Sequence, residues 1–256
     1  MESSSVRTTD ASYRKTFAAS GDASNYDERV YAPGSSADLL WQVEAPILRR
    51  EAEAAIQGKK DVSYLDFACG TGRVISLLED LGETATGIDI SPHMLERAKL
   101  KCHKAKFINT DITAAGAPIE GQYDLITSFR FLTNAEDDLR QAALARLRDR
   151  LKEDGVLIVN THSNPWSYRA FLLPYHWLKD RLNSRPLFGY LSNRKARHLL
   201  LSAGFKVEKV IGVGFVPEKL LPLLPYGLAH RMENSLAGKS FVQSFGLNQI
   251  FVCTRA

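Results

Sequence analysis

Cysteine is scarce in this chain, and its few copies are widely spaced. The 256 residues include three cysteines, Cys69, Cys102 and Cys253, whose spacing matches neither a disulfide framework nor a metal-ligand motif. The pattern predicts a reducing, cytoplasmic compartment and no bound metal.

Long apolar runs are equally missing. Residues 1–15 lack the hydrophobic segment of a secretory signal, and no stretch elsewhere is long enough to cross a bilayer. Residues 1–25 are rich in Ser, Thr and Asp, which predicts a mobile tail ahead of a single domain formed by residues 26–256.

A strong charge of one sign is absent too. The net charge is +4, the basic residues are scattered, and no long basic stripe of the kind that binds nucleic acid is present. We interpret Arg140, Arg146, Arg148 and Arg150 as a solvated helix face. A nucleic-acid partner is therefore not expected.

The sequence does contain a regular alternation of short apolar segments and amphipathic ones. Strand-like segments occupy residues 63–68, 84–90, 105–110, 123–129, 155–161, 206–215 and 248–255. Helix-like segments occupy residues 35–56 with a break at Pro46, 73–82, 91–104, 134–151 with Asn134 as the cap, and 194–205. Because the strands are almost uniformly apolar, the alternation predicts a parallel sheet covered by helices on both faces.

Two segments interrupt this alternation. Residues 163–190 combine Trp, Tyr and Phe with prolines, and residues 214–246 form a second irregular apolar insert. We interpret both as lids over a substrate site. Residues 214–232 could also make a weak contact with a membrane surface, although they contain few basic residues.

A glycine-rich turn follows the first predicted strand, in the segment LDFACGTGRV of residues 65–74. Glycine at such a turn lets a ligand approach the backbone, and the next helix offers free N–H groups. Gly70 and Gly72 match two positions of the dinucleotide fingerprint G-x-G-x-x-G, but Ile75 occupies the third. This departure argues against an NAD-dependent oxidoreductase.

An acidic residue ahead of the turn changes the interpretation. Asp66 ends the strand, and the run DFACGTG up to Gly72 resembles the first motif of class I S-adenosylmethionine-dependent methyltransferases. That family favours glycine where this chain has Ala68. The resemblance implies a Rossmann-like, seven-stranded, mostly parallel sheet with the last strand antiparallel and lid inserts after strands five and six. It also implies S-adenosylmethionine as the cofactor and S-adenosylhomocysteine as the product.

The same resemblance implies further cofactor contacts. Asp89, at the end of the second strand, would bind the ribose hydroxyls, and Asp111 would bind the adenine amine, unless it caps a short turn. Asp124 on the fourth strand is expected to be structural. The predicted cofactor-binding residues are Asp66, Ala68, Gly70, Gly72, Asp89, Ile90, Asp111, Ile112, Phe129 and Tyr31, the last from a segment that covers the cofactor in related enzymes.

The acceptor is expected beyond the carboxyl ends of the strands, where ligands of open α/β sheets bind. The catalytic candidates are His162, whose ordinary pKa suits a base, and Arg130, which could bind an anionic or polyhydroxyl acceptor. Each could instead be structural: His162 could hold the insert, and Arg130 could pair with an acid. Asn164, Trp166 and Tyr168 are the predicted substrate-binding residues, with packing inside the insert as the alternative.

We therefore expect an enzyme that methylates a small molecule or a glycan, at oxygen, by in-line displacement. One alternative is an RNA or other macromolecule methyltransferase. The Asn/Asp-Pro-Pro-aromatic motif of amino-methylating enzymes is missing, since the place after strand four reads SFRF. The other alternative is a cofactor-binding protein without catalysis.

Overall fold

The computed structural model describes Arg14 and residues 32–114, 116–172, 191–217, 220, 223–237, 239 and 241–256. Its centre is a seven-stranded sheet in the order β3-β2-β1-β4-β5-β7-β6. The strands are β1 (Ser63–Phe67), β2 (Thr84–Asp89), β3 (Lys106–Asn109), β4 (Tyr123–Ser128), β5 (Leu151–Thr161), β6 (Phe205–Val213) and β7 (Asn248–Arg255).

The strands of this sheet run parallel except for β7. Strands β1 to β5 pair in parallel, whereas β7 is antiparallel to both β5 and β6. The carboxyl ends of β1, β2, β4, β5 and β6 therefore lie at one edge, together with the beginning of β7. The predicted seven-stranded, mostly parallel sheet with an antiparallel last strand is confirmed.

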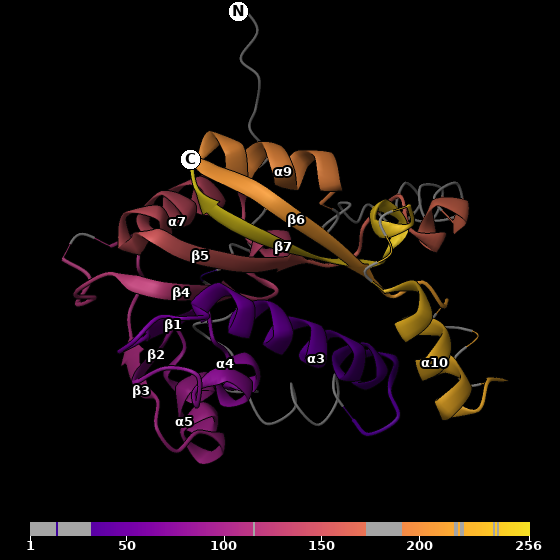
Figure 1. The fold of residues 1–256 in the computed structure, drawn as a ribbon, viewed down its shortest axis with the longest axis horizontal. Helices are drawn as coiled ribbons and strands as arrows, with labels where there is room; N and C mark the ends of the chain where they lie inside the picture. The colour runs from indigo at the N-terminus through magenta and orange to yellow at the C-terminus, as the bar shows by residue number, and fades with distance from the viewer. Residues whose placement is uncertain are drawn as a thin grey trace, which may run out of the picture.

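Helices cover both faces of the sheet (Figure 1). The helices are α3 (Ser36–Ile56), α4 (Arg73–Leu78), α5 (Pro92–Lys101), α6 (Phe131–Asn134), α7 (Asp137–Arg150), α9 (Asn193–Ser202) and α10 (Tyr226–Leu236), with short 3-10 helices η1 (Tyr168–Leu172) and η3 (Gln243–Phe245). Apolar residues of α6, α7 and α9 form a core with one face, and those of α3 and α4 form a core with the other. None of the described helices is long and apolar enough to cross a membrane.

Three local predictions are wrong. Helix α3 continues through Pro46, because its buried face from Leu39 to Ala52 packs on the sheet and outweighs the loss of one N–H donor. Asn134 ends the short helix α6 instead of capping the next one, and Glu136 stands at the N-cap of α7. The insert 214–246 is not wholly irregular, since it contains α10.

Arg140 also differs from its prediction as a solvated side chain. It is buried, and its guanidinium donates hydrogen bonds to the carbonyl oxygens of Leu132 and Thr133 and pairs with Asp137. Leu132 and Thr133 belong to the last turn of α6, where carbonyl groups have no partner inside the helix. Arg140 therefore holds α6 against α7 at the carboxyl edge of the sheet.

Candidate active site

The glycine-rich turn adopts a left-handed backbone at three of its residues. Ala68, Gly70 and Gly72 have φ values of 55°, 54° and 82°. A Cβ atom at Gly70 would face open space, whereas one at Gly72 would lie 2.8 Å from the Cβ of Ala98 on α5. Gly70 thus leaves the backbone open to a ligand, and Gly72 allows the turn to pack closely on α5.

Asp89 holds the turn in place from the end of β2. Its Oδ2 accepts the N–H of Gly70 at 2.8 Å, and its Oδ1 accepts the N–H of Ser91 at 2.9 Å. Ser91 in turn caps α5 with its hydroxyl, and Pro92 begins that helix, as predicted. Asp89, which is predicted to bind the ribose, therefore also fixes the glycine-rich turn and the start of α5.

Asp66 is a buried carboxylate that the fold satisfies only in part. Its Oδ1 accepts the hydroxyl of Thr127 at 2.6 Å, while Oδ2 is buried without a hydrogen-bond partner among the described residues. Burial raises the pKa of Asp66 to about 7, against the hydrogen bond from Thr127, which lowers it. An acid of this kind favours a cationic ligand beside it, since a nearby positive charge stabilises the ionised form.

A small, open cleft lies beside the turn at the carboxyl edge. Its walls are mostly apolar, with acidic groups at the ends of β2 and β3, a combination that fits a nucleoside. Residues that line it are Arg14, Phe67, Ala68, Asp89, Ile90, Thr110, Asp111, Phe131 and Leu139. Four predicted cofactor residues, Ala68, Asp89, Ile90 and Asp111, thus come together here.

Arg14 and Asp111 meet at this cleft. Arg14 Nε lies 2.7 Å from Asp111 Oδ2, and Thr113 donates its N–H and hydroxyl to Asp111 Oδ1. Burial raises the pKa of Asp111, but the hydrogen bonds from Thr113 and Arg14 outweigh it and hold the pKa below its usual range. Asp111 therefore caps a turn as well as lining the cleft.

Two predicted cofactor residues lie in the hydrophobic core. Ile112 packs into the core on the α7 side of the sheet, and Phe129 packs into the core on the α3 side. Phe131 and Leu139 supply the apolar wall instead. Sequence reasoning missed both because they lie on helices after β4, where no motif marks them; Tyr31 lies outside the described residues.

The acceptor candidates meet where β5 ends. The N–H of His162 donates to the hydroxyl of Thr133 at 3.0 Å, which fixes the loop against α6. Arg130 has a left-handed backbone with φ 65°, and its N–H donates to Asn160 Oδ1 at 2.7 Å. Burial, then the charges of Arg130 and Arg169, lower the pKa of His162 to about 3, so its imidazole is neutral at physiological pH.

The predicted substrate-binding residues have different settings. Asn164 is fully buried, and its amide group donates to the carbonyl oxygens of Ser244 and Gly246, so it ties the loop after β5 to the segment before β7. Trp166 is 64% exposed. Tyr168 is partly buried and packs against the core on the α3 side.

A row of buried, uncharged polar atoms crosses the same edge. Thr161 on β5 pairs with Gln249 on β7, and Ser128 lies on the neighbouring strand β4. Ser128 Oγ, Thr161 Oγ1 and Gln249 Oε1 have no hydrogen-bond partner among the described residues. Buried polar groups normally find partners, so these atoms mark a place where a polar ligand would be stabilised.

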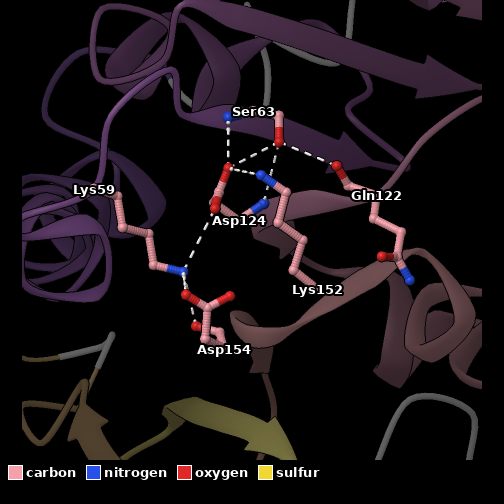
Figure 2. A network of polar contacts seen from close by, with 6 residues as sticks. All are labelled: Lys59, Ser63, Gln122, Asp124, Lys152 and Asp154. Atoms are coloured by element: carbon pink, nitrogen blue, oxygen red, sulfur yellow. Dashed lines mark hydrogen bonds and ion pairs between the residues drawn. The ribbon is translucent and has the colours of Figure 1, made fainter.

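Asp124 belongs to the opposite edge, as the prediction of a structural role requires. It accepts the N–H and hydroxyl of Ser63, each at 2.9 Å, and it pairs with Lys152 at 2.7 Å and Lys59 at 3.4 Å (Figure 2). Burial raises its pKa, but these partners outweigh burial and lower it to about 2. The network joins the starts of β1 and β4 and takes no part in the cleft.

A family model described as a methyltransferase domain matches residues 41–210 of the chain, which include the turn, the edge around His162 and every residue that lines the cleft except Arg14. The chain belongs to this methyltransferase family. Its class I fold and its S-adenosylmethionine-dependent activity follow from that membership.

Curated relatives of this methyltransferase include two enzymes of quinone biosynthesis. The ubiquinone/menaquinone biosynthesis C-methyltransferase UbiE of Campylobacter jejuni is 30% identical over 91% of this chain and 94% of its own length. A ubiquinone biosynthesis O-methyltransferase of Psychrobacter arcticus is 26% identical over 66% of this chain and 67% of its own length.

Solved structures show the same fold. Magnesium protoporphyrin IX methyltransferase from Synechocystis, with bound SAH, aligns with a TM-score of 0.61 and 18% identity over 95% of this chain and 97% of that one. An S-adenosylmethionine-dependent methyltransferase from Clostridium acetobutylicum also gives 0.61, with 16% identity over 91% and 97%.

The residues of this methyltransferase fit S-adenosylmethionine. The cleft offers an apolar wall and acidic groups for the nucleoside, and the open side of Gly70 admits a ligand to the backbone. The unpartnered Oδ2 of Asp66 suits the ammonium group of the methionine part. When bound, the cofactor supplies an electrophilic methyl group on a sulfonium.

Proposed function

We propose that this methyltransferase modifies an oxygen atom of a small, hydroxylated molecule at the edge where β4 and β5 end. The observation that carries the proposal is the setting of His162, a neutral imidazole close to two guanidinium groups. Its Nδ1 is buried without a hydrogen-bond partner among the described residues. A neutral imidazole with a free nitrogen is suited to receive a hydrogen bond from a hydroxyl group.

The cations beside His162 suggest how the acceptor oxygen becomes reactive. The positive charges of Arg130 and Arg169 lower the pKa of His162, and they would lower the pKa of a hydroxyl bound next to the ring in the same way. An ionised oxygen is the better nucleophile for in-line displacement. We therefore assign His162 a positioning role, because a group with a pKa of about 3 is a weak base at neutral pH.

The chemistry of the edge supports a small, polar but uncharged acceptor. Ser128, Thr161 and Gln249 offer hydroxyl and amide oxygens in a buried row, and such atoms suit the hydroxyl groups of a phenol or a sugar. One relative is named for O-methylation in ubiquinone biosynthesis and another for C-methylation in the same kind of pathway. The arginines at His162 would favour the ionised form of a hydroxyl bound beside the ring, and from this we infer that the methyl group passes to that oxygen.

The test uses methyl-labelled S-adenosylmethionine. The full chain is incubated with cell extract, and lipid, polar small-molecule, RNA and protein fractions are separated. Asp66→Asn is the matched control, because asparagine keeps the size of the side chain and an oxygen for Thr127 but removes the carboxylate. Label as a methyl ether in a small-molecule or lipid fraction, absent with the control, supports the proposal.

Other outcomes contradict it. Label on carbon would move the chemistry to C-methylation, and label in RNA would show a macromolecular acceptor. Cofactor binding by calorimetry with no label in any fraction would favour a binding protein. With the acceptor in hand, the pH dependence of the rate tests the role of His162. A rate that decreases as the pH is lowered through the ordinary histidine pKa, and that loses this dependence in His162→Gln, would show that His162 acts as a base after all.

A further inference from the structure

Exposed apolar side chains are concentrated between β6 and β7. Among the described residues, ten large hydrophobic side chains are exposed, and seven of them lie in this insert. They are Leu220, Leu223, Tyr226, Leu228, Met232, Phe241 and Phe245, and we call them the apolar face of the insert. Leu223 is 76% exposed and Phe241 is 75% exposed. A gathering of this kind on a soluble surface marks an interaction site.

The insert is firmly attached to the rest of the fold. Glu233 on α10 is buried, and its carboxylate accepts the N–H groups of Gly214, Phe215 and Val216 at 3.0, 2.8 and 2.6 Å. Ala229, one turn earlier, is also buried. Because Ala229 and Glu233 face the protein, Leu228 and Met232, which are also one turn apart, are held outward.

The exposed charges of the insert that the structure describes are basic, while one acidic side chain from another element, Asp38 of α3, acts on Tyr226, whose pKa is raised by burial and then by the Asp38 charge. Among the described residues of the insert, the exposed charged side chains are Arg231 and Lys239, and the acidic Glu233 is buried against the backbone. An apolar face with basic residues beside it is complementary to an anionic lipid surface.

The insert also lies at the correct edge of the sheet. It follows the carboxyl end of β6, which is the edge that carries the cleft and His162, and Figure 1 shows α10 projecting beyond the sheet at the end of β6. We propose that the apolar face of the insert binds the surface of an anionic lipid bilayer, so that the open edge of the site faces the membrane. This binding does not depend on which atom receives the methyl group.

Vesicle sedimentation tests the proposal. The full chain is mixed with vesicles of phosphatidylcholine alone or of phosphatidylcholine with phosphatidylglycerol. We expect binding to the anionic vesicles that weakens with added salt and is much weaker on the neutral ones. The double variant Leu228→Ser/Met232→Ser should bind the anionic vesicles about tenfold less tightly, because it removes two apolar side chains from the contact. Arg231→Gln should weaken binding to the anionic vesicles only.

The chain offers a matched control in Leu100, which is 75% exposed on α5, away from the insert. Leu100→Ser removes the same kind of side chain and should leave vesicle binding unchanged. All of these side chains are exposed, so the variants should keep the thermal unfolding midpoint of the parent chain. Failure of the parent chain to bind anionic vesicles, or equal loss in Leu100→Ser, would overturn the proposal. So would a dimer in ultracentrifugation that the double variant converts to monomers without any effect on vesicles.

Discussion

The buried acidic residues of this methyltransferase differ in how completely the fold satisfies them. Glu79 accepts the N–H groups of His103, Lys104 and Ala105, and these bonds outweigh burial and lower its pKa. Asp66 accepts one side-chain hydrogen bond, from Thr127, and burial raises its pKa in spite of that bond and the backbone of Ile75. A buried carboxylate whose oxygens accept hydrogen bonds from the protein itself stabilises the fold. A buried carboxylate beside a cleft, with one oxygen that lacks such a partner, is suited to bind a ligand.

The affinity for S-adenosylmethionine should depend on the ionisation of Asp66. Since its pKa is about 7 in the folded protein and 3.8 is its ordinary value, Asp66 holds a proton below pH 7 and cannot pair with the cofactor ammonium. We expect the dissociation constant to rise about tenfold for each pH unit below 7. Titration calorimetry on both sides of pH 7 measures it, in buffers of different ionisation enthalpy that reveal the released proton.

Asp66→Asn is the control for that measurement. The variant should bind the cofactor weakly and with no pH dependence in the same range. The sign for stability is opposite to that for binding: because the folded pKa is raised, the unliganded fold loses stability as the pH rises from about 4 towards 7. Binding that is equally tight on both sides of pH 7 would show that Asp66 does not hold the ammonium group.

At the scale of elements, the sequence predicts the sheet better than the helix ends. The strands are apolar runs that alternate with helices. Each run is apolar because its strand is buried, so the composition of each segment is enough to predict it. The ends of α6 and α7 depend on Arg140, which reaches across to the carbonyls of Leu132 and Thr133. The order of residues gives no sign of such a tertiary contact, and the same holds for Glu233 beneath α10.

The candidate site divides in the same way. Asp66, Gly70 and Asp89 were predicted because a short motif fixes them within one strand–turn–helix unit and the strand beside it. Arg14, Phe131 and Leu139 line the cleft from segments distant in the sequence or without a motif, and only the folded chain brings them there. The motif therefore predicts the residues of the turn and of the end of β2, including the apolar Ala68 and Ile90, but not the part of the apolar wall that Phe131 and Leu139 supply.

The two glycines of the turn should respond differently to alanine. At Gly72 a Cβ would meet Ala98 at 2.8 Å and the backbone of α5 at 2.9 Å, so Gly72→Ala combines left-handed strain with overpacking. We expect a loss of about 2–5 kcal/mol in the free energy of unfolding. Gly70→Ala has strain alone, about 1–2 kcal/mol, and Ala68 with φ 55° shows that alanine can adopt this conformation here.

Denaturant unfolding and cofactor calorimetry separate the two effects. Gly70→Ala should fold but lose cofactor affinity, because its methyl group would occupy the open side of the turn. Gly72→Ala should instead show the larger decrease in the free energy of unfolding. Equal losses of stability in the two variants would show that the close approach to α5 is not what requires glycine at position 72.

At the scale of the whole molecule, the candidate site and the Asp124 network occupy opposite edges of one sheet. The carboxyl edge carries left-handed backbone and unpartnered polar atoms, from Asp66 to Gln249. The amino edge carries the Asp124 network, in which each oxygen of the carboxylate has a partner (Figure 2). Buried polar atoms without hydrogen-bond partners are tolerated at the candidate site because the same strands are anchored at their other ends.

The Asp124 network should therefore set the acid stability of the protein. The pKa of Asp124 is about 2 in the folded state against an ordinary 3.8, so its contribution is present above pH 4 and is lost as the pH falls towards 2. Asp124→Asn should lower the free energy of unfolding at pH 7 by about 2 kcal/mol. Denaturant unfolding followed by circular dichroism over this pH range should show the difference from the parent chain shrinking in acid.

Asp154→Asn provides the comparison within the same network. Asp154 pairs with Lys59 at 2.7 Å, but its side chain is 73% exposed, so water and salt screen the pair and its loss should change stability by less than about 1 kcal/mol. The two carboxylates share Lys59, and they differ in burial and in the backbone N–H that only Asp124 receives from Ser63. If Asp154→Asn proved as damaging as Asp124→Asn, or if the effect of Asp124→Asn were the same at pH 7 and in acid, Lys59 and not the buried carboxylate would be the group that anchors this edge.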